Sequence, residues 1–175
     1  QLYRQEGRED KRMQEILLLA DYQQIPIQIL SKIKCDEWSN NAIHQGVLAE
    51  IKISKQLSEP DLFAWLSQRS QNENKPPFLL VLDEVQDPHN LGACLRSANA
   101  AGADAVIIPQ DRSVSMTPSV RKIAAGAAEM TPLFIVTNLA TTLDKLKKAG
   151  VWCYGLDQSA TQLIYDTALT GSLAL

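Results

Sequence analysis

The sequence predicts an α/β protein in which a domain built on a parallel sheet follows a small α/β domain. In residues 78–175, short apolar runs alternate with helical patterns of about ten residues, as they do in repeated βαβ units. Residues 70–77, SQNENKPP, are polar and end in two prolines, which is typical of a linker. We therefore expect a first domain at residues 1–69, a linker at 70–77 and a second domain at 78–175.

The first domain is expected to consist of short alternating helices and strands. Apolar residues with helical spacing predict the helices, and short apolar runs predict the strands. In chain order these are a helix at 11–23, strands at 25–30 and 46–53, and a helix at 58–70. The last helix has Ser58 as its expected N-cap and carries Leu62, Trp65 and Leu66 on one face.

The second domain shows the alternation more clearly. Expected strands are at 78–85, 105–109, 133–137, 151–157 and 172–175, and expected helices are at 91–101, 117–128 and 139–149. Helix starts are marked by Thr117 with Pro118 and by Asn138, whereas Gly102 and Gly150 follow helix ends. Apolar strands joined by helices predict a parallel sheet with right-handed crossovers.

The composition excludes several classes of protein. Apolar residues make up 45% of the 175 residues, which is enough for a core. The longest apolar runs, about five residues, are too short to cross a membrane. Three widely spaced cysteines, Cys35, Cys94 and Cys153, fit neither a disulfide framework nor a zinc site. We therefore expect free thiols in the cytoplasm, no bound metal and no membrane partner.

The charge pattern leaves two interpretations of one basic cluster. A formal net charge of −3 argues against a protein that coats nucleic acid through bulk charge. Arg4, Arg8, Lys11 and Arg12 nevertheless lie close together near the start of the chain, interleaved with acidic residues. They can be a solvated helix face or a contact with RNA phosphates.

Residues 83–102, DEVQDPHNLGACLRSANAAG, carry the polar groups of greatest interest. They follow an apolar strand, and the ligands of open parallel sheets bind beyond the carboxyl ends of the strands. Asn90 is the expected N-cap of the next helix. The small residues Gly92, Ala93 and Cys94 allow a close approach to that helix, whose start favours an anion or a polar ligand.

Arg96 lies in the same helix, beside its apolar packing face, and therefore needs a partner. That partner can be a carboxylate, such as Asp83, Asp87 or Glu129, or it can be a phosphate. The spacing alone leaves a structural ion pair and a ligand contact equally open.

These residues carry a family resemblance. The string D-P-x-N-x-G-A-x-x-R-x-A, here DPHNLGACLRSA, resembles the first of the three motifs of the SpoU-type RNA 2′-O-ribose methyltransferases of the SPOUT class. The stretches GREDKR and AIHQGVLAEI resemble the small RNA-binding domain of the bacterial RlmB-type 23S rRNA guanosine methyltransferases. The resemblance covers the chain from about Arg4 to Leu175.

The resemblance implies an L30e-like RNA-binding domain followed by a methyltransferase domain that binds S-adenosylmethionine in a trefoil knot at a homodimer interface. Asn90 and Arg96 match the family's catalytic asparagine and arginine, and Glu129 matches an acidic position that supports this arginine. Gly155 and Leu156 would border the adenosine of the cofactor. The implied substrate is a guanosine ribose of 23S rRNA. A tRNA ribose and a non-catalytic RNA-binding fragment are the alternatives.

The chain departs from the family pattern at its end. It stops at TGSLAL, where the family continues into a glycine-rich second motif and an S-L-N third motif that form the knot. We therefore interpret the chain as a fragment that lacks the knot segment and also the opening strand and helix of the small domain.

Overall fold

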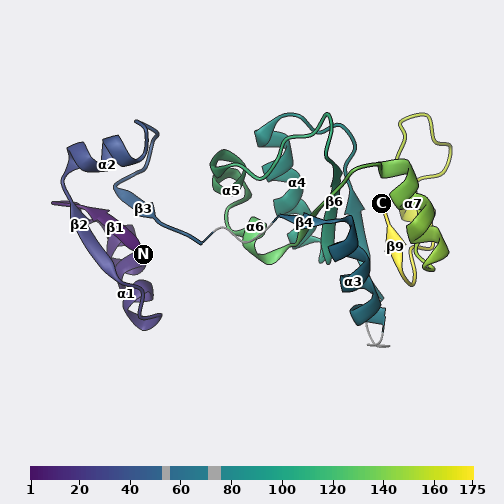
Figure 1. Ribbon diagram of the computed structural model, residues 1–175, viewed down its shortest axis with the longest axis horizontal. Helices are drawn as coiled ribbons and strands as arrows, with labels where there is room; N and C mark the ends of the chain where they lie inside the picture. Colours follow the sequence, from purple (N-terminus) through teal and green to yellow (C-terminus); the bar gives the residue numbers. More distant parts are fainter. Residues whose placement is uncertain (53–55, 71–75) are drawn as a thin grey trace. The chain divides into compact units, whose positions relative to one another are not determined.

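The computed structural model describes residues 1–52, 56–70 and 76–175, which form two compact units, Gln1–Ser54 and Lys55–Leu175 (Figure 1). The boundary between the units lies well before residue 69, the predicted end of the first domain. The predicted linker falls mostly on residues 71–75, which lie outside the described residues. Each unit has its own sheet.

The described part of the first unit is a three-stranded sheet with two helices. Its central strand is parallel to one neighbour and antiparallel to the other, in the order β2-β1-β3. Tyr3, Leu30 and Cys35 form its small core, and the rings of Tyr3 and Trp38 meet edge to face with centroids 5.0 Å apart. The elements are β1 (Leu2–Gln5), α1 (Lys11–Tyr22), β2 (Ile27–Leu30), α2 (Lys32–Trp38) and β3 (Val47–Ala49).

The second unit contains a six-stranded sheet in the order β4-β7-β6-β5-β9-β8, and all its neighbouring strands are parallel. The predicted parallel α/β fold is therefore confirmed. The strands are β4 (Leu57–Ser58), β5 (Phe78–Val81), β6 (Ala105–Pro109), β7 (Leu133–Val136), β8 (Trp152–Cys153) and β9 (Leu173–Ala174). The helices are α3 (Glu59–Ser70), α4 (Pro88–Ala100), α5 (Pro118–Ala124), α6 (Ala127–Met130) and α7 (Leu139–Lys148), with a 3-10 turn, η1, at Ile164–Asp166.

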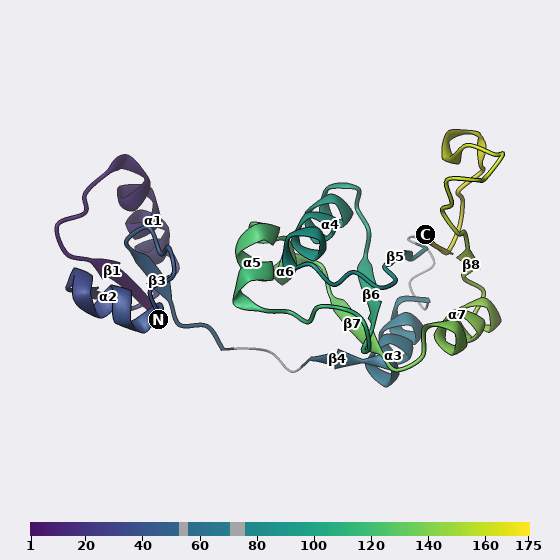
Figure 2. The same ribbon diagram turned by 90° about the horizontal axis from the view of Figure 1, so that it is seen from above.

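Helices cover both faces of this sheet (Figure 2). Successive residues of β6 point to opposite faces, as a strand requires. Val106 and Ile108 pack in the core beneath α4, α5 and α6, whereas Ala105 and Ile107 pack in the core beneath α3 and α7. A strand that is buried on both faces explains why AVIIP is apolar throughout.

The segment β4–α3 belongs to the second unit, although its sequence position suggested the first domain. Leu57 pairs with Phe134 of β7, and Leu62 and Leu66 lie in the core of the large sheet. Arg69 near the end of α3 forms an ion pair with Asp104, just before β6. A polar stretch marks a loop in the sequence, but the apolar face of the preceding helix decides which core that helix joins.

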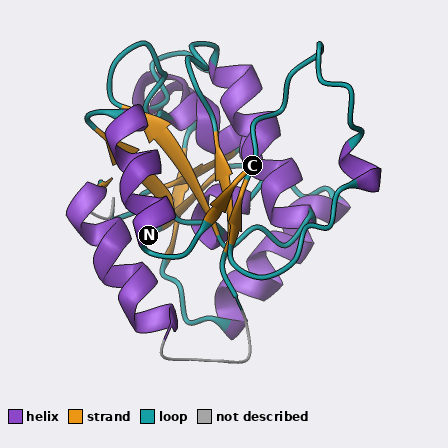
Figure 3. Cartoon of the chain, turned by 90° about the vertical axis from the view of Figure 1, so that its right-hand side faces the viewer, coloured by secondary structure: helices purple, strands orange, loops and turns teal. Residues whose placement is uncertain are grey.

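Two predicted elements are interrupted. The helix expected at 117–128 breaks after α5, because Ala125 (φ 50°) and Gly126 (φ 91°) adopt left-handed conformations before α6 begins. The strand expected at 151–157 is reduced to β8. The chain then leaves the sheet in a long connection to β9, which Figure 3 shows as the loop with a single helical turn at the right.

Among the described residues, no helix combines the length and the apolar character needed to span a bilayer.

Candidate active site

The candidate site is built around the first turns of α4. Asp87 is the N-cap: its carboxylate accepts a hydrogen bond from the His89 N–H at 2.9 Å, and Pro88 occupies the first helical position. Asn90 is therefore the third residue of the helix and not its cap, and its side chain is exposed. The Asp-Pro pair was the sequence signal for this earlier start, because an aspartate before a proline is a favoured way to open a helix.

Gly92 lets α5 pack closely against α4. The glycine is buried, and a Cβ at this position would lie 2.7 Å from the Cβ of Ile123 and 3.1 Å from the carbonyl oxygen of Val120. The close approach predicted at this small residue is real. The neighbour is a second helix of the same fold, and not a ligand.

Arg96 lies one turn after Gly92, on the flank of α4 that faces α5. Its side chain is exposed and, within the described ranges, forms no hydrogen bond or ion pair. Six residues separate Arg96 from Asn90, which places their side chains about 120° apart around the helix axis and about 9 Å apart along it. The two residues therefore lie on different flanks of α4.

Glu129 has a partner other than the one expected. Its carboxylate forms an ion pair with the guanidinium of Arg121, which is only partly exposed. Asp87, another candidate partner of Arg96, is used as the cap of α4. Arg96 is thus not held in a structural ion pair by either carboxylate.

A second ion pair joins two loops at the carboxyl edge of the sheet. Glu84 and Arg112 both have left-handed backbone conformations, with φ of 55° and 56°, and their side chains meet at 2.7 Å. The contact with the Glu84 carboxylate raises the pKa of Arg112. The Val114 N–H also donates to the Val85 carbonyl at 2.9 Å. No sequence pattern predicts this pair, because only the pairing of β5 with β6 brings the two loops together.

A pocket of about 770 Å³ lies at the carboxyl ends of β8 and β9. Gly155 and Leu156, the residues expected to border the cofactor, line it together with Tyr154 and Leu163. Because β9 lies next to β5, this pocket and the start of α4 share one edge of the sheet. This is the edge at which open parallel sheets bind their ligands.

The lining of this pocket fits S-adenosylmethionine, which has a flat aromatic end and hydrogen-bonding edges. There is open space where a Cβ on Gly155 would stand, so a ring can approach the backbone there. Leu156 is 65% exposed and offers an apolar surface, while Asp157 and Gln158 supply polar groups. These residues could hold the adenosine of the cofactor.

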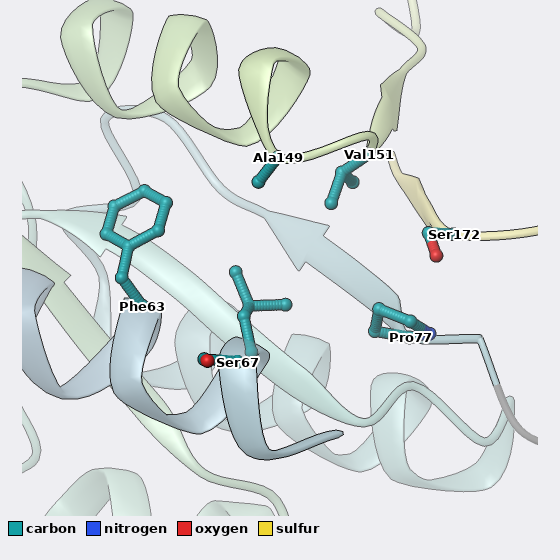
Figure 4. Close-up of a pocket in the computed structure, with 7 residues that line it drawn as sticks. Phe63, Ser67, Pro77, Ala149, Val151 and Ser172 are labelled. Atoms are coloured by element: carbon teal, nitrogen blue, oxygen red, sulfur yellow. The ribbon is translucent and has the colours of Figure 1, made fainter. Parts of the chain in front are cut away.

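A smaller pocket, of about 390 Å³, lies at the opposite edge of the sheet, before the strands begin (Figure 4). It separates α3 from the end of α7. The residues drawn around it include Phe63, Ser67, Pro77, Ala149, Val151 and Ser172. Its position places it outside the candidate active site.

The basic cluster of the first unit does not form one helix face. Arg4 lies on β1, whereas Lys11 and Arg12 are exposed in the first turn of α1. Arg8 lies between the two elements, forms an ion pair with Asp10 and packs against Gly46, where a Cβ would stand 2.7 Å from the Arg8 Cδ. Lys11 and Arg12 are therefore the better-placed residues for binding a phosphate.

The cysteines are free thiols. Cys35 is buried and Cys94 and Cys153 are half-buried, and burial raises the pKa of each thiol. Raised values favour the protonated, unreactive form. In the part of the chain that the structure describes, no cluster of histidine, cysteine and acidic residues could hold a metal ion.

The second unit, with its parallel sheet and a pocket at the carboxyl ends of the strands, defines the class of open α/β ligand-binding proteins. Comparison with known proteins then gives the family. Residues 77–175 match the SpoU rRNA Methylase family, and residues 1–57 match the family described as RNA 2′-O ribose methyltransferase substrate binding. The chain belongs to the SpoU rRNA methylase family.

Individual relatives are similar over the whole chain. The chain is 46% identical over 175 residues to the 23S rRNA (guanosine-2′-O-)-methyltransferase RlmB of Pseudomonas putida, covering 100% of this chain and 68% of that protein. It is 47% identical over 174 residues to RlmB of Coxiella burnetii, covering 99% and 68%. The chain thus spans about two thirds of the length of these relatives.

Solved structures show the same fold. The SpoU methyltransferase AviRb from Streptomyces viridochromogenes, in complex with the cofactor AdoMet, is 17% identical and aligns with a TM-score of 0.68 over 99% of this chain and 63% of that chain. A putative RNA methyltransferase of the TrmH family from Porphyromonas gingivalis aligns with a TM-score of 0.60 over 99% and 62%.

Proposed function

We propose that this chain takes part in the S-adenosylmethionine-dependent methylation of a guanosine 2′-oxygen in 23S rRNA. One observation carries the proposal: the family string DPHNLGACLRSA opens a helix at the same sheet edge as the Gly155–Leu156 pocket. The names of the relatives state this reaction and this RNA.

Arg96 and Asn90 are proposed to position the RNA. The sulfonium of S-adenosylmethionine supplies an activated methyl group, so the protein has to orient the ribose and assist removal of a proton. A guanidinium stays protonated in proteins and binds phosphate through two parallel hydrogen bonds. Arg96, exposed and without a partner in the described structure, is free to bind a phosphate beside the target ribose, and Asn90 can contact the nucleotide from the other flank.

The test is Arg96→Lys in the complete protein, with methyl transfer to a 23S rRNA fragment as the measurement. Lysine keeps the charge but lacks the planar fork, so we expect a loss of at least about tenfold in kcat/KM. Arg112→Lys is the matched control, because Arg112 lies at the same sheet edge in an exposed ion pair. Wild-type turnover by Arg96→Lys would remove Arg96 from this role.

The substrate is tested by comparing 23S rRNA fragments with tRNA transcripts under the same conditions. We expect methyl transfer to the rRNA. Transfer to tRNA alone would point to the tRNA alternative. RNA binding without methyl transfer, together with no heat of S-adenosylmethionine binding in calorimetry, would point to an RNA-binding fragment.

The assembly proposed for the complete protein is a homodimer in the cytoplasm, with an L30e-like first domain and a trefoil knot. Exposed apolar side chains support a second protein surface at the connection between β8 and β9: Leu163 is 63% exposed and Tyr165 is 93% exposed. Sedimentation of the complete protein tests the dimer, and a structure that includes the family's second and third motifs tests the knot.

A further inference from the structure

We propose that Arg121 holds Glu129 away from Arg96 and thereby leaves Arg96 free to bind an RNA phosphate. Arg121 is in this view a positioning residue that acts through Glu129. The inference rests on the proposed function, because it assumes that the ligand of Arg96 is RNA.

The ion pair of Arg121 with Glu129 is formed by a fold-back of the chain. The two residues are eight positions apart, on α5 and on α6. Between them, the left-handed residues Ala125 and Gly126 end one helix and redirect the chain into the next. A continuous helix would separate positions 121 and 129 by about 12 Å along its axis. The break therefore brings the carboxylate to Arg121.

Helix α4 packs against both of these helices, and Arg96 is an exposed residue of α4 that lies between two of its contacts with them. One turn earlier, Gly92 touches Ile123 of α5. Three residues later, the Asn99 side-chain oxygen accepts a hydrogen bond from the Thr131 hydroxyl, at the end of α6, at 3.3 Å. The contacts of Gly92 with α5 and of Asn99 with the end of α6 thus lie on either side of Arg96 along α4.

The charges explain why the partner of Glu129 matters. Half of the side-chain surface of Glu129 is exposed. Its carboxylate can therefore turn toward the guanidinium of Arg121 or toward that of Arg96. While Arg121 holds the Glu129 carboxylate, the guanidinium donors of Arg96 stay available for a phosphate. Without Arg121, the Glu129 carboxylate loses its partner, and in this proposal it pairs with Arg96 and competes with the RNA for the same donors.

The experiment is a double-variant cycle in the complete protein, with affinity for a 23S rRNA fragment measured by fluorescence anisotropy at several salt concentrations. We expect Arg121→Gln to weaken RNA binding about tenfold and to flatten the salt slope by about one phosphate contact. We expect Arg121→Gln with Glu129→Gln to recover most of this affinity, because the competing carboxylate is gone. Arg121→Lys should stay close to the wild type, since an ammonium can also hold the carboxylate.

A structural role for Arg121, or a direct phosphate contact by it, would give a different pattern. A structural role would leave the double variant as weak as Arg121→Gln, whereas a direct phosphate contact would give a recovery that persists when Arg96 is also replaced by Gln. Either result overturns the inference, which requires that the recovery depend on Arg96. Glu129→Gln alone provides a second test should Arg121→Gln unfold: it releases Arg121 and should tighten RNA binding, so weaker binding contradicts the inference. If the wild type binds rRNA but the double variant does not recover this affinity, only the present inference is rejected. If the wild type does not bind rRNA, the proposed function is rejected.

Discussion

Gly92 of α4 and Ile123 of α5 are packed so closely that no side chain fits between them: a Cβ on residue 92 would lie 2.7 Å from both the Cβ and the Cγ2 of Ile123. This contact fixes the spacing between α4, which carries Arg96, and α5. The glycine of the family string therefore acts on the site through helix packing, by setting the distance between α4 and α5.

Gly92→Ala should destabilise the protein by roughly 1–3 kcal/mol, because the added methyl group must push α5 away from α4. The measurement is urea unfolding followed by circular dichroism. Gly155→Ala is the matched control, since Gly155 does not have a left-handed conformation and has open space at its Cβ position, so its stability should change little. Equal effects of the two substitutions would show that helix packing is not the cause.

Asp104→Ala should destabilise the second unit by roughly 1–3 kcal/mol, the range for leaving buried polar groups without partners. The Asp104 carboxylate is largely buried, pairs with Arg69 and accepts the Phe78 N–H at 3.0 Å. The substitution therefore removes the ion pair with Arg69 at the end of α3 and the acceptor of the Phe78 N–H at the start of β5. Asp104→Asn retains an acceptor for the Phe78 N–H and should lose less stability, and a loss as large as that of the alanine variant would contradict this account.

Asp10 should make the first unit sensitive to acid. Its hydrogen bond with Arg8, together with the Met13 N–H that it accepts as N-cap of α1, lowers the pKa of Asp10. Because the folded pKa is lower than the unfolded one, this stabilisation is fully present above the ordinary pKa of aspartate, about 3.9, and is lost as the pH falls through the folded value.

The comparison for this prediction is Asp10→Asn, which keeps a capping side chain but has no charge to titrate. The difference in unfolding midpoint between wild type and variant should be largest near neutral pH and should vanish below the folded pKa. A difference that stays constant with pH would show that the Asp10 charge does not contribute.

Lys11 and Arg12 should account for more of the RNA salt dependence than Arg8. Each phosphate contact contributes about 0.7–0.9 to the slope of log K against log salt. Replacing Lys11 and Arg12 by glutamine should therefore flatten the slope by up to two contacts, whereas Arg8→Gln should change it little, since Arg8 is already paired with Asp10. Lys147 and Lys148 of α7, replaced together, form the charge-matched control.

The order and type of most elements can be predicted from the sequence alone, because the signals for them are local. Thr117 with Pro118 and Asn138 mark helix starts that the structure reproduces, because a cap and a proline act on the adjacent backbone. Apolar runs such as residues 105–109 predicted buried parallel strands. The family string identified Asn90 and Arg96 as candidates, whose catalytic roles stay predictions.

Which elements and side chains meet depends on how the chain folds in three dimensions. The folded chain places α3 in the second unit, where Leu62 and Leu66 are buried. It also pairs Glu129 with Arg121 and Glu84 with Arg112. The fold also places Gly92 of α4 against α5. Such relationships depend on contacts between residues far apart in the chain, and local propensity does not encode which of several suitable partners is within reach.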